Sequence, residues 1–381
     1  MHRRWLFPLL PVLGAVLLSV SGAPSSARTA SPAPVAGWTS VAAGQFHSCA
    51  IATDDTLWCW GYNGLGQLGD GTFTDHLRPG PVAGDARWTI VTAGESHTCG
   101  IQTDSSLWCW GSSIYGQLGQ GDKHSKRVPT RVGKDQWVAV DAGRWHTCAI
   151  KVDHSLWCWG NNFEGQIGDG TDQPTRLRPT QVGNEFNWQM VAGGAADTCG
   201  IRQAGTLWCW GGNSDGELGL GDTEQRLSPT QVGNGHGWTL VTLGYLHTCG
   251  IENQSLSCWG QNTDGQLGIG NTDDQSSPVQ VDQRSWQDAS AGQSHTCALR
   301  TIGGLWCWGL NDTGQLGDRT TDSHTTPRHI GNSRLWTRLS AGFVHTCGTR
   351  SNGTLWCWGS NGGGQLGDGT TTDRHQPHRV K

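Results

Sequence analysis

The chain consists of seven near-copies of one segment about fifty residues long, and this repetition limits its possible folds more than any other feature. The copies begin at Trp38, Trp88, Trp137, Trp188, Trp238, Trp286 and Trp336. A fixed period in this range marks a repeat architecture, in which each unit packs on its neighbours because it cannot bury its faces alone. Seven similar units without an atypical polar unit at either end predict a ring that closes on itself.

Four short runs in each copy have the composition of β-strands. In the first copy they begin at Trp38, His47, Leu57 and Pro79, and each is bounded by Gly, Asp or Pro. The chain shows no sustained apolar period of 3.6 residues, which disfavours helices. Four antiparallel strands repeated around an axis make a propeller blade. The sequence therefore predicts an all-β fold, a seven-bladed β-propeller with about four strands per blade.

A Pro-x-x-Val or Pro-x-x-Ile run occurs eight times, once more than the other motifs. The runs begin at Pro32, Pro79, Pro129, Pro179, Pro229, Pro278, Pro327 and Pro377. Proline lacks an amide donor and suits an edge strand, so we expect this run to form the outer strand of each blade. We expect the spare run, Pro32–Val35, to meet Pro377–Val380 and close the ring where the termini come together.

The fourteen cysteines fall into seven pairs, with one member in the second predicted strand of a copy and one in the third. The pairs are Cys49 with Cys59, Cys99 with Cys109, Cys148 with Cys158, Cys199 with Cys209, Cys249 with Cys258, Cys297 with Cys307, and Cys347 with Cys357. A turn centred on Asp54 would place Cys49 opposite Cys59, at a separation that a disulfide can span. The spacing of the fifth pair is one residue shorter, and a two-residue turn at Asn253-Gln254 would restore the register.

We therefore expect seven disulfides, each within one blade. Reduced, buried cysteines are one alternative. The other is metal ligation by His47, Cys49 and Cys59, but this would need seven three-ligand sites that each lack a fourth protein ligand. We predict no metal site and no cofactor.

Residues 1–27 have the features of an export signal. Arg3 and Arg4 precede an apolar run from Trp5 to Val20, and small residues follow as far as Ala27. The run falls short of the ~20 apolar residues that a membrane-spanning helix needs, so a retained anchor is the weaker alternative. We expect signal cleavage, a single secreted propeller at residues 28–381, and no membrane association after cleavage.

Three motifs recur in the same order in the copies: Ala-Gly-x-x-His-Thr-Cys, Leu-Trp-Cys-Trp-Gly and Gly-Gln-Leu-Gly. Together they resemble the repeats of the regulator of chromosome condensation family, and the resemblance covers nearly all of residues 38–381. It implies a seven-bladed propeller. The functions it implies differ widely: nucleotide exchange on a nuclear small GTPase, ultraviolet sensing, and inhibition of β-lactamases by a secreted propeller. Fold alone does not choose among them.

The motif histidines occupy one repeat position, where the fourth copy has Asp197. They are His47, His97, His146, His247, His295 and His345. Acid–base catalysis needs one group placed beside a substrate or nucleophile, whereas a sixfold repeat is typical of hydrogen-bonded scaffold residues. Since no Ser-His-Asp arrangement or phosphate-binding loop stands apart from the repeat, we predict that the protein is not an enzyme. Its net charge of −5 disfavours nucleic acid as a partner.

Two residues between the glycine after the first strand and the motif histidine differ from copy to copy. The pairs are Gln45-Phe46, Glu95-Ser96, Arg144-Trp145, Ala195-Ala196, Tyr245-Leu246, Gln293-Ser294 and Phe343-Val344. Propeller geometry places all seven pairs, which we call the rim, on one face near the ring centre. Large apolar residues there are typical of interaction surfaces. We predict that a partner binds through Phe46, Glu95, Arg144, Trp145, Tyr245, Leu246, Phe343 and Val344. The alternative is that these side chains pack on one another across the central channel.

The leading prediction is a secreted, non-catalytic, monomeric protein-binding propeller that inhibits or adapts an extracellular protein. One alternative is a carbohydrate-binding module of the cell surface, with Trp58 and Trp60 as the stacking platform, although strand tryptophans more often fill the space between blades. A guanine-nucleotide exchange factor is the third candidate. Export and disulfides count against it, because small GTPases work in the cytosol.

Overall fold

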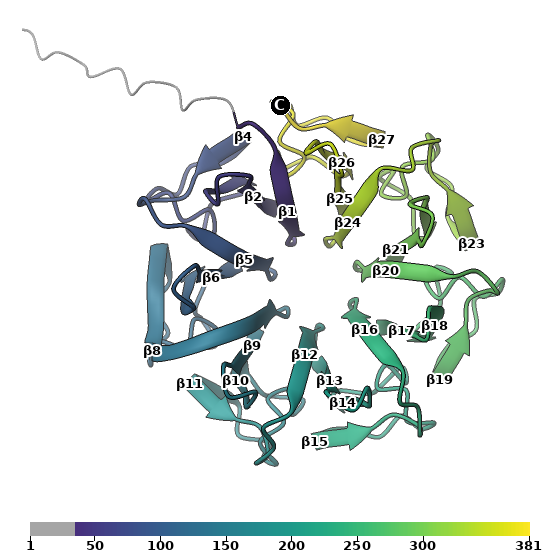
Figure 1. Ribbon diagram of the computed structural model, residues 1–381, viewed down its shortest axis with the longest axis horizontal. Coiled ribbons are helices and arrows are strands. Elements are labelled where there is room, and N and C mark those ends of the chain that lie inside the picture. Colours follow the sequence, from purple (N-terminus) through teal and green to yellow (C-terminus); the bar gives the residue numbers. More distant parts are fainter. Residues whose placement is uncertain (1–34) are drawn as a thin grey trace, which may run out of the picture. The chain divides into compact units, whose positions relative to one another are not determined.

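Seven antiparallel blades surround a central channel in the computed structural model, which describes residues 35–381 (Figure 1). Blade 1 contains β1 (Trp38–Ala43), β2 (His47–Ala52), β3 (Leu57–Gly61) and β4 (His76–Pro81). Blades 2 and 3 contain β5 (Trp88–Ala93), β6 (His97–Gln102), β7 (Ser106–Gly111), β8 (Lys126–Ala142), β9 (His146–Lys151), β10 (Leu156–Asn161) and β11 (Thr175–Gln181). The sequence prediction of an all-β, seven-bladed propeller is confirmed.

The other four blades repeat the order of blade 1. Blade 4 contains β12 (Trp188–Gly193), β13 (Asp197–Arg202), β14 (Leu207–Gly211) and β15 (Arg226–Gln231), and blade 5 contains β16 (Trp238–Leu243), β17 (His247–Glu252), β18 (Ser255–Gly260) and β19 (Gln275–Gln280). Blade 6 contains β20 (Trp286–Ala291), β21 (His295–Arg300), β22 (Leu305–Gly309) and β23 (His324–His329), and blade 7 contains β24 (Trp336–Ala341), β25 (His345–Arg350), β26 (Leu355–Gly359) and β27 (Arg374–Arg379).

Strand β8 departs from the pattern of four separate strands per blade. It runs for 17 residues from the edge of blade 2 into the first strand of blade 3, so these blades share one seven-stranded sheet. The link stays extended because Gln136 pairs with Ser106, and because Asp135 and Lys151 form an ion pair of 3.0 Å. Gly133, at φ 61°, supplies the bend within it.

The second and third strands of every blade form a hairpin that aligns its two cysteines. All seven pairs form disulfides with a Cα–Cα distance of 4.1 Å. The bonds join Cys49 to Cys59, Cys99 to Cys109, Cys148 to Cys158, Cys199 to Cys209, Cys249 to Cys258, Cys297 to Cys307, and Cys347 to Cys357. This geometry fits the pairing expected from the spacing, and residues 35–381 include no free cysteine.

The hairpin of blade 5 keeps this register although its turn is one residue shorter. Cys249 lies directly opposite Cys258, as Cys49 lies opposite Cys59 in blade 1. Asn253 and Gln254 have φ values of 50° and 66°, the left-handed geometry of a two-residue hairpin turn. The shorter turn therefore leaves the disulfide in place.

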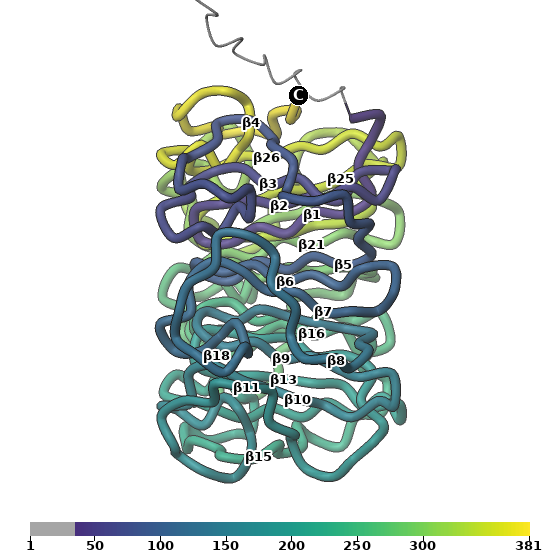
Figure 2. The backbone as a smooth tube through the Cα atoms, turned by 90° about the vertical axis from the view of Figure 1, so that its left-hand side faces the viewer, coloured from purple at the N-terminus to yellow at the C-terminus, as the bar shows by residue number. Residues whose placement is uncertain are grey.

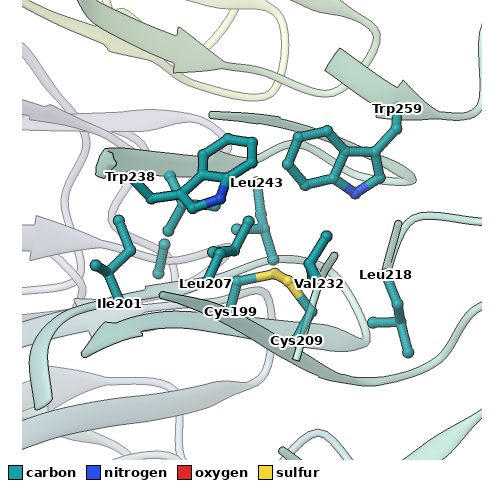
Figure 3. Close-up of a cluster of buried hydrophobic side chains, with 11 residues drawn as sticks. Cys199, Ile201, Leu207, Cys209, Leu218, Val232, Trp238, Leu243 and Trp259 are labelled. Carbon is teal, nitrogen blue, oxygen red and sulfur yellow. A yellow bond between two sulfur atoms is a disulfide. The ribbon is translucent and has the colours of Figure 1, made fainter. Parts of the chain in front are cut away.

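The core lies between the blades. Figure 3 shows the junction of blades 4 and 5, where Trp238 and Trp259 pack over the disulfide of Cys199 and Cys209. The two indole rings meet edge to face at 5.9 Å, and Trp259 is fully buried. The glycine that ends the Gly-Gln-Leu-Gly motif makes room for this tryptophan. A Cβ added at Gly219 would come within 2.6 Å of the Trp259 ring, and its φ of 72° also favours glycine.

The proline runs form the edge strands, as expected from proline's missing donor. Pro79, Pro179 and Pro377, for example, lie in β4, β11 and β27, which are the last strands of their sheets. Their side chains are half-buried.

The ring closes between blades 1 and 7. The amide of Trp38 donates to the carbonyl of Gly353 at 2.9 Å, and Val35 packs against a cluster that includes Trp38 and Val380. Figure 2 shows β1 beside β25, close to the C-terminus. Pro32–Pro34 and the expected signal at 1–27 lie outside the described residues. Within residues 35–381, no helix is long and apolar enough to span a membrane.

Candidate protein-binding face

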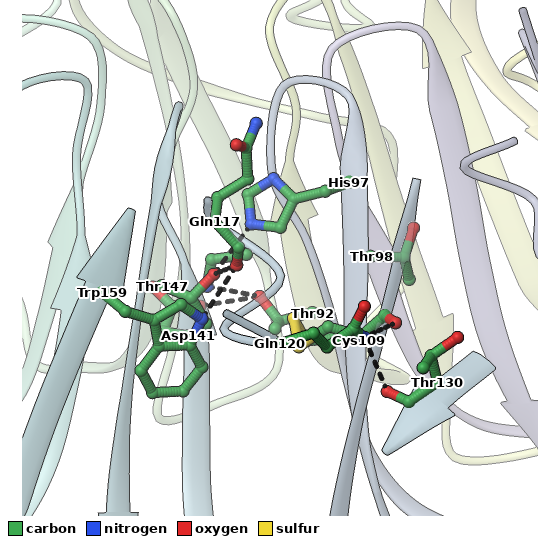
Figure 4. The surroundings of a disulfide bond; sticks show 12 residues. Thr92, His97, Thr98, Cys109, Gln117, Gln120, Thr130, Asp141, Thr147 and Trp159 are labelled. Atoms are coloured by element: carbon green, nitrogen blue, oxygen red, sulfur yellow. Dashed lines mark hydrogen bonds between the residues drawn. A yellow bond between two sulfur atoms is a disulfide. The ribbon is translucent and has the colours of Figure 1, made fainter. Parts of the chain in front are cut away.

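A ring of buried histidines supports the rim from below. Figure 4 shows one unit, in which His97 Nε2 lies 2.9 Å from the hydroxyl of Thr147, and that hydroxyl donates to the backbone carbonyl of Gln117. Since the hydroxyl proton is used there, Nε2–H is the donor in the bond to Thr147. Burial, reinforced by the two neighbouring histidines, lowers the pKa of His97 to about 3. Trp159 Nε1 donates to the same Gln117 carbonyl, which ties three segments together.

The same hydrogen bond joins six of the seven blade junctions. The bonds are His47–Thr98, His97–Thr147, His146–Thr198, His247–Thr296, His295–Thr346 and His345–Ser48, each 2.9 Å long. This repetition assigns the histidines to the scaffold, because every one of them is bound to the next blade. Within residues 35–381, no three His, Cys, Asp or Glu side chains gather in a way that could hold a metal ion.

The junction of blades 4 and 5 has two carboxylic acids in place of the usual neutral pair. Asp197 replaces the histidine, Glu217 replaces the glutamine of Gly-Gln-Leu-Gly, and each is 2% exposed. Burial, together with the charge of Glu217, raises the pKa of Asp197, and burial raises the pKa of Glu217. The hydroxyl of Thr248 still donates to the backbone carbonyl of Glu217 at 2.9 Å, as in the other junctions. The imidazole donor of the other junctions is missing here.

The rim lies around a central cavity of about 100 Å³. The first residue of every rim pair lines this cavity, together with the preceding glycine. Neighbouring rim loops are joined through their backbones, as in the 2.9 Å bond from Arg144 N to Gly194 O and the 3.2 Å bond from Phe343 N to Gly44 O. The scaffold therefore holds seven variable turns in one compact circle.

Arg144 contacts three other rim residues. Its guanidinium donates to the Glu95 carboxylate and to the Tyr245 hydroxyl, and lies 3.8 Å from the ring centroid of Trp145. Phe343 continues the cluster, with its ring centroid 5.9 Å from that of Tyr245.

Phe46 completes the cluster at 6.4 Å from Phe343. The structure thus brings together six of the eight predicted site residues. The other two, Leu246 and Val344, are half-buried on the same turns, and their carbonyls accept hydrogen bonds from neighbouring turns.

These contacts show that the rim side chains pack on one another, as the alternative interpretation of the sequence required. They nevertheless stay accessible: Phe46 is 39% exposed, and the side chains of Arg144 and Glu95 are 27% and 19% exposed. Mutual packing fixes side-chain rotamers in advance and so reduces the entropy lost on binding. A rim of this kind is a pre-ordered surface rather than a closed core.

Sequence reasoning missed a second set of turns beside the rim. In blade 1 the amide of Tyr62, which follows β3, donates to the Phe46 carbonyl at 2.8 Å. In blades 2 and 3 the Tyr115 ring lies 5.2 Å from Trp145 and 6.2 Å from Phe163. The available signal was the pair before Gly-Gln-Leu-Gly, which varies between copies as freely as the rim does.

The tryptophans proposed as a carbohydrate platform offer no open ring face. Trp60 is fully buried and Trp58 is 9% exposed. In four of the five blades where the equivalent of Trp58 is half-buried, a cation covers its ring. For example, the Lys151 ammonium lies 3.7 Å from the Trp157 ring centroid, and the Arg202 guanidinium lies 3.9 Å from that of Trp208. These aromatic surfaces are used within the protein.

Comparison with known proteins supports the same architecture. The family model described as "Regulator of chromosome condensation (RCC1) repeat" matches residues 54–101, 104–150, 153–201, 204–251, 256–299, 303–348 and 352–381. A second model of this repeat matches residues 38–67, 88–117, 137–166, 286–315 and 336–365. A comparison with curated protein sequences finds no match.

Solved structures similar to this chain include human WBSCR16, at a TM-score of 0.77 and 20% identity, with 86% of this chain and 94% of that chain covered. Prp20p from Saccharomyces cerevisiae, described with its binding to Gsp1p and histones, has a TM-score of 0.77 and 20% identity, with 91% and 88% covered. The ectodomain of the Arabidopsis thaliana receptor kinase ACR4 has a TM-score of 0.55 and 20% identity, with 91% and 98% covered. At these identities the likeness shows the fold alone, whereas the repeat matches span most of the sequence, and the chain belongs to the regulator of chromosome condensation (RCC1) repeat family.

Proposed function

We propose that this chain is a secreted, non-catalytic propeller that binds an extracellular protein through its rim, as an inhibitor or adaptor. The observation that carries the proposal is the cluster of Phe46, Arg144, Trp145, Tyr245 and Phe343 on turns that an otherwise uniform scaffold holds in one circle. Aromatic residues and arginine dominate the binding energy of protein interfaces, and clustering near the centre of a contact is typical of such residues.

The disulfides support an extracellular site of action. Each of the seven blades has one, and such bonds persist in oxidising compartments but are rare in the cytosol. This favours the secreted binding protein over the exchange-factor alternative, which requires a cytosolic or nuclear GTPase. The apolar segment Trp5–Val20, which follows Arg3 and Arg4, is typical of an export signal and also supports secretion. N-terminal sequencing of the protein from culture medium tests cleavage near Ala27.

Affinity capture tests the binding proposal. The mature chain, residues 28–381, is immobilised as wild type and as Trp145→Ala/Phe343→Ala, and both are exposed to culture supernatant. We expect mass spectrometry to find a protein that the wild type retains and the variant loses. Thr39→Ala on β1, away from the rim, is the control and should retain it. A captured protein held equally by all three chains would refute rim binding, and binding of glycans alone on an array would favour the carbohydrate alternative.

A further inference from the structure

A second circle of variable residues surrounds the rim on the same face. In each blade, the residue after the glycine that ends the third strand donates its amide to the carbonyl of the second rim residue, as in the 2.8 Å bond from Gln261 to Leu246. The variable pair that follows is therefore held beside the rim all round the ring. We call these pairs the outer turns: Gly64-Leu65, Ile114-Tyr115, Phe163-Glu164, Ser214-Asp215, Thr263-Asp264, Asp312-Thr313 and Gly362-Gly363.

Each outer turn of blades 1 to 3 has a large, exposed apolar side chain, and the turn of blade 3 also has the exposed Glu164. Leu65, Ile114 and Phe163 are 38%, 56% and 57% exposed, which is unusual for such large apolar side chains. They are continuous with the rim, because Tyr115 packs between Trp145 and Phe163. We call Phe46, Tyr62, Leu65, Ile114, Tyr115, Trp145 and Phe163 the aromatic half.

The outer turns of blades 4 to 6 each have an aspartate instead. Asp215, Asp264 and Asp312 form what we call the acidic half, and none of the ion pairs within residues 35–381 includes them. Neutral side-chain amides orient two of them. Gln261 donates to Asp215 and Gln315 donates to Asp312, both at 3.2 Å.

No basic residue of the rim pairs or outer turns offsets these charges. Arg144 is the only Lys or Arg among them, and its charge is already paired with Glu95. The outer turns of blades 1 to 3 thus present mainly apolar surface, with Glu164 as their one acid, and those of blades 4 to 6 present carboxylates without a countercharge.

We propose that the partner is a protein whose contact surface has an apolar projection with lysine or arginine residues on one side of it. The projection packs on the aromatic half, and the basic residues face Asp215, Asp264 and Asp312. Complementary charge at the edge of an interface accelerates association and fixes orientation, while like charge excludes other partners. A second copy of this chain does not fit, because its net charge of −5 would repel the acidic half. This inference rests on the proposed function and specifies its partner.

A binder selection with a defined probe tests the inference. The probe is a phage-displayed two-helix scaffold with randomised surface positions, selected on the mature chain. We expect clones that need the aromatic half, losing at least about tenfold in affinity on Trp145→Ala/Phe163→Ala, to be enriched in both apolar and basic residues. On Asp264→Asn/Asp312→Asn, their association at low salt should slow by about tenfold, and high salt should remove the difference.

Asp55→Asn/Asp85→Asn is the matched control, because these exposed acids lie at the opposite ends of the strands and their loss should leave association unchanged. Thermal midpoints of all variants verify folding. Clones that depend on Trp145 and Phe163 but lack basic residues and bind Asp264→Asn/Asp312→Asn normally would overturn the inference and leave the proposed function intact. Clones indifferent to the aromatic-half variant would overturn both. Self-association strengthened by Asp264→Asn/Asp312→Asn would identify a second copy as the occupant and also reject the inference.

Discussion

The interior of this propeller repeats nearly the same residues from blade to blade, whereas the rim has a different residue pair in every blade. Six blade junctions use the same imidazole–hydroxyl bond, and all seven blades have a disulfide in the same register. On the rim no two residue pairs are identical, although all seven occupy equivalent backbone positions. Neighbouring blades must pack on each other at every junction, and six of the seven junctions do so with the same hydrogen bond. Rim residues do not have to pack between blades, so their differences are better explained by contact with a binding partner.

The interior has one exception, at the junction of blades 4 and 5. Asp197 and Glu217 place two acids where the other junctions have a neutral bonded network. The missing imidazole donor and the two buried acids predict that this junction contributes less stability than the other six. Substitutions in the interior and on the rim can separate residues that stabilise the fold from residues that bind a partner. The largest effect is expected in the interior.

Removing a tryptophan between blades should destabilise the protein most. Trp159 is fully buried, and Trp159→Ala removes both its packing and its bond to the Gln117 carbonyl. Core truncation of this kind costs about 3–5 kcal/mol. Urea unfolding followed by circular dichroism measures this loss. A loss below about 1 kcal/mol would mean that the blades do not depend on their shared core.

Removing one disulfide should have the next largest effect. Changing both Cys148 and Cys158 to alanine opens a closed loop of about eleven residues, which chain-entropy arguments value at about 2–3 kcal/mol. The same urea titration measures it. The equivalent change at Cys249 and Cys258 should cost a similar amount, since the register is the same. Unequal losses would contradict the equivalence of the blades.

Restoring the usual junction should stabilise the protein. Asp197→His/Glu217→Gln supplies the missing donor to Thr248 and removes two buried acids, a gain of about 1–2 kcal/mol at neutral pH. Acids whose pKa is raised by folding contribute stability at low pH and lose it as the pH rises through the folded pKa. A buried histidine such as His146, with its pKa lowered to about 4, behaves oppositely and loses stability as the pH falls below about 6.5.

Removing the two acids and adding a buried histidine therefore both make the gain in stability of Asp197→His/Glu217→Gln larger at high pH. The thermal midpoint of the repaired variant should exceed that of the wild type clearly at pH 8, and the difference should shrink by pH 5. Glu217→Gln alone should give part of the gain. A difference that grows on acidification would show that the carboxyl groups are not the source of the effect.

Most of the scaffold could be predicted from the sequence because it depends on local register. The spacing of Cys249 and Cys258 and the turn between them were enough to place the two strands. The pairing of Asp197 with Glu217 could not be foreseen, because it needs the three-dimensional contact between a strand and a turn twenty positions away. Likewise, the continuity of β8 depends on Asp135 reaching Lys151. The outer turns were overlooked because their residues adjoin a structural motif, so that Tyr115 and Phe163 looked like parts of a return loop.

The central claim is that rim residues hold a partner while the repeated residues hold the fold. Trp145→Ala and Trp159→Ala test it most directly, since each removes one tryptophan from the same blade, and each variant is measured for both unfolding and binding of the captured partner. We expect Trp145→Ala to weaken binding by about 2 kcal/mol, some thirtyfold, with an unchanged unfolding midpoint. Trp159→Ala should lower the midpoint and leave the affinity of the folded fraction unchanged. The opposite pattern, with Trp145→Ala unfolding as readily as Trp159→Ala and binding normally, would contradict the account.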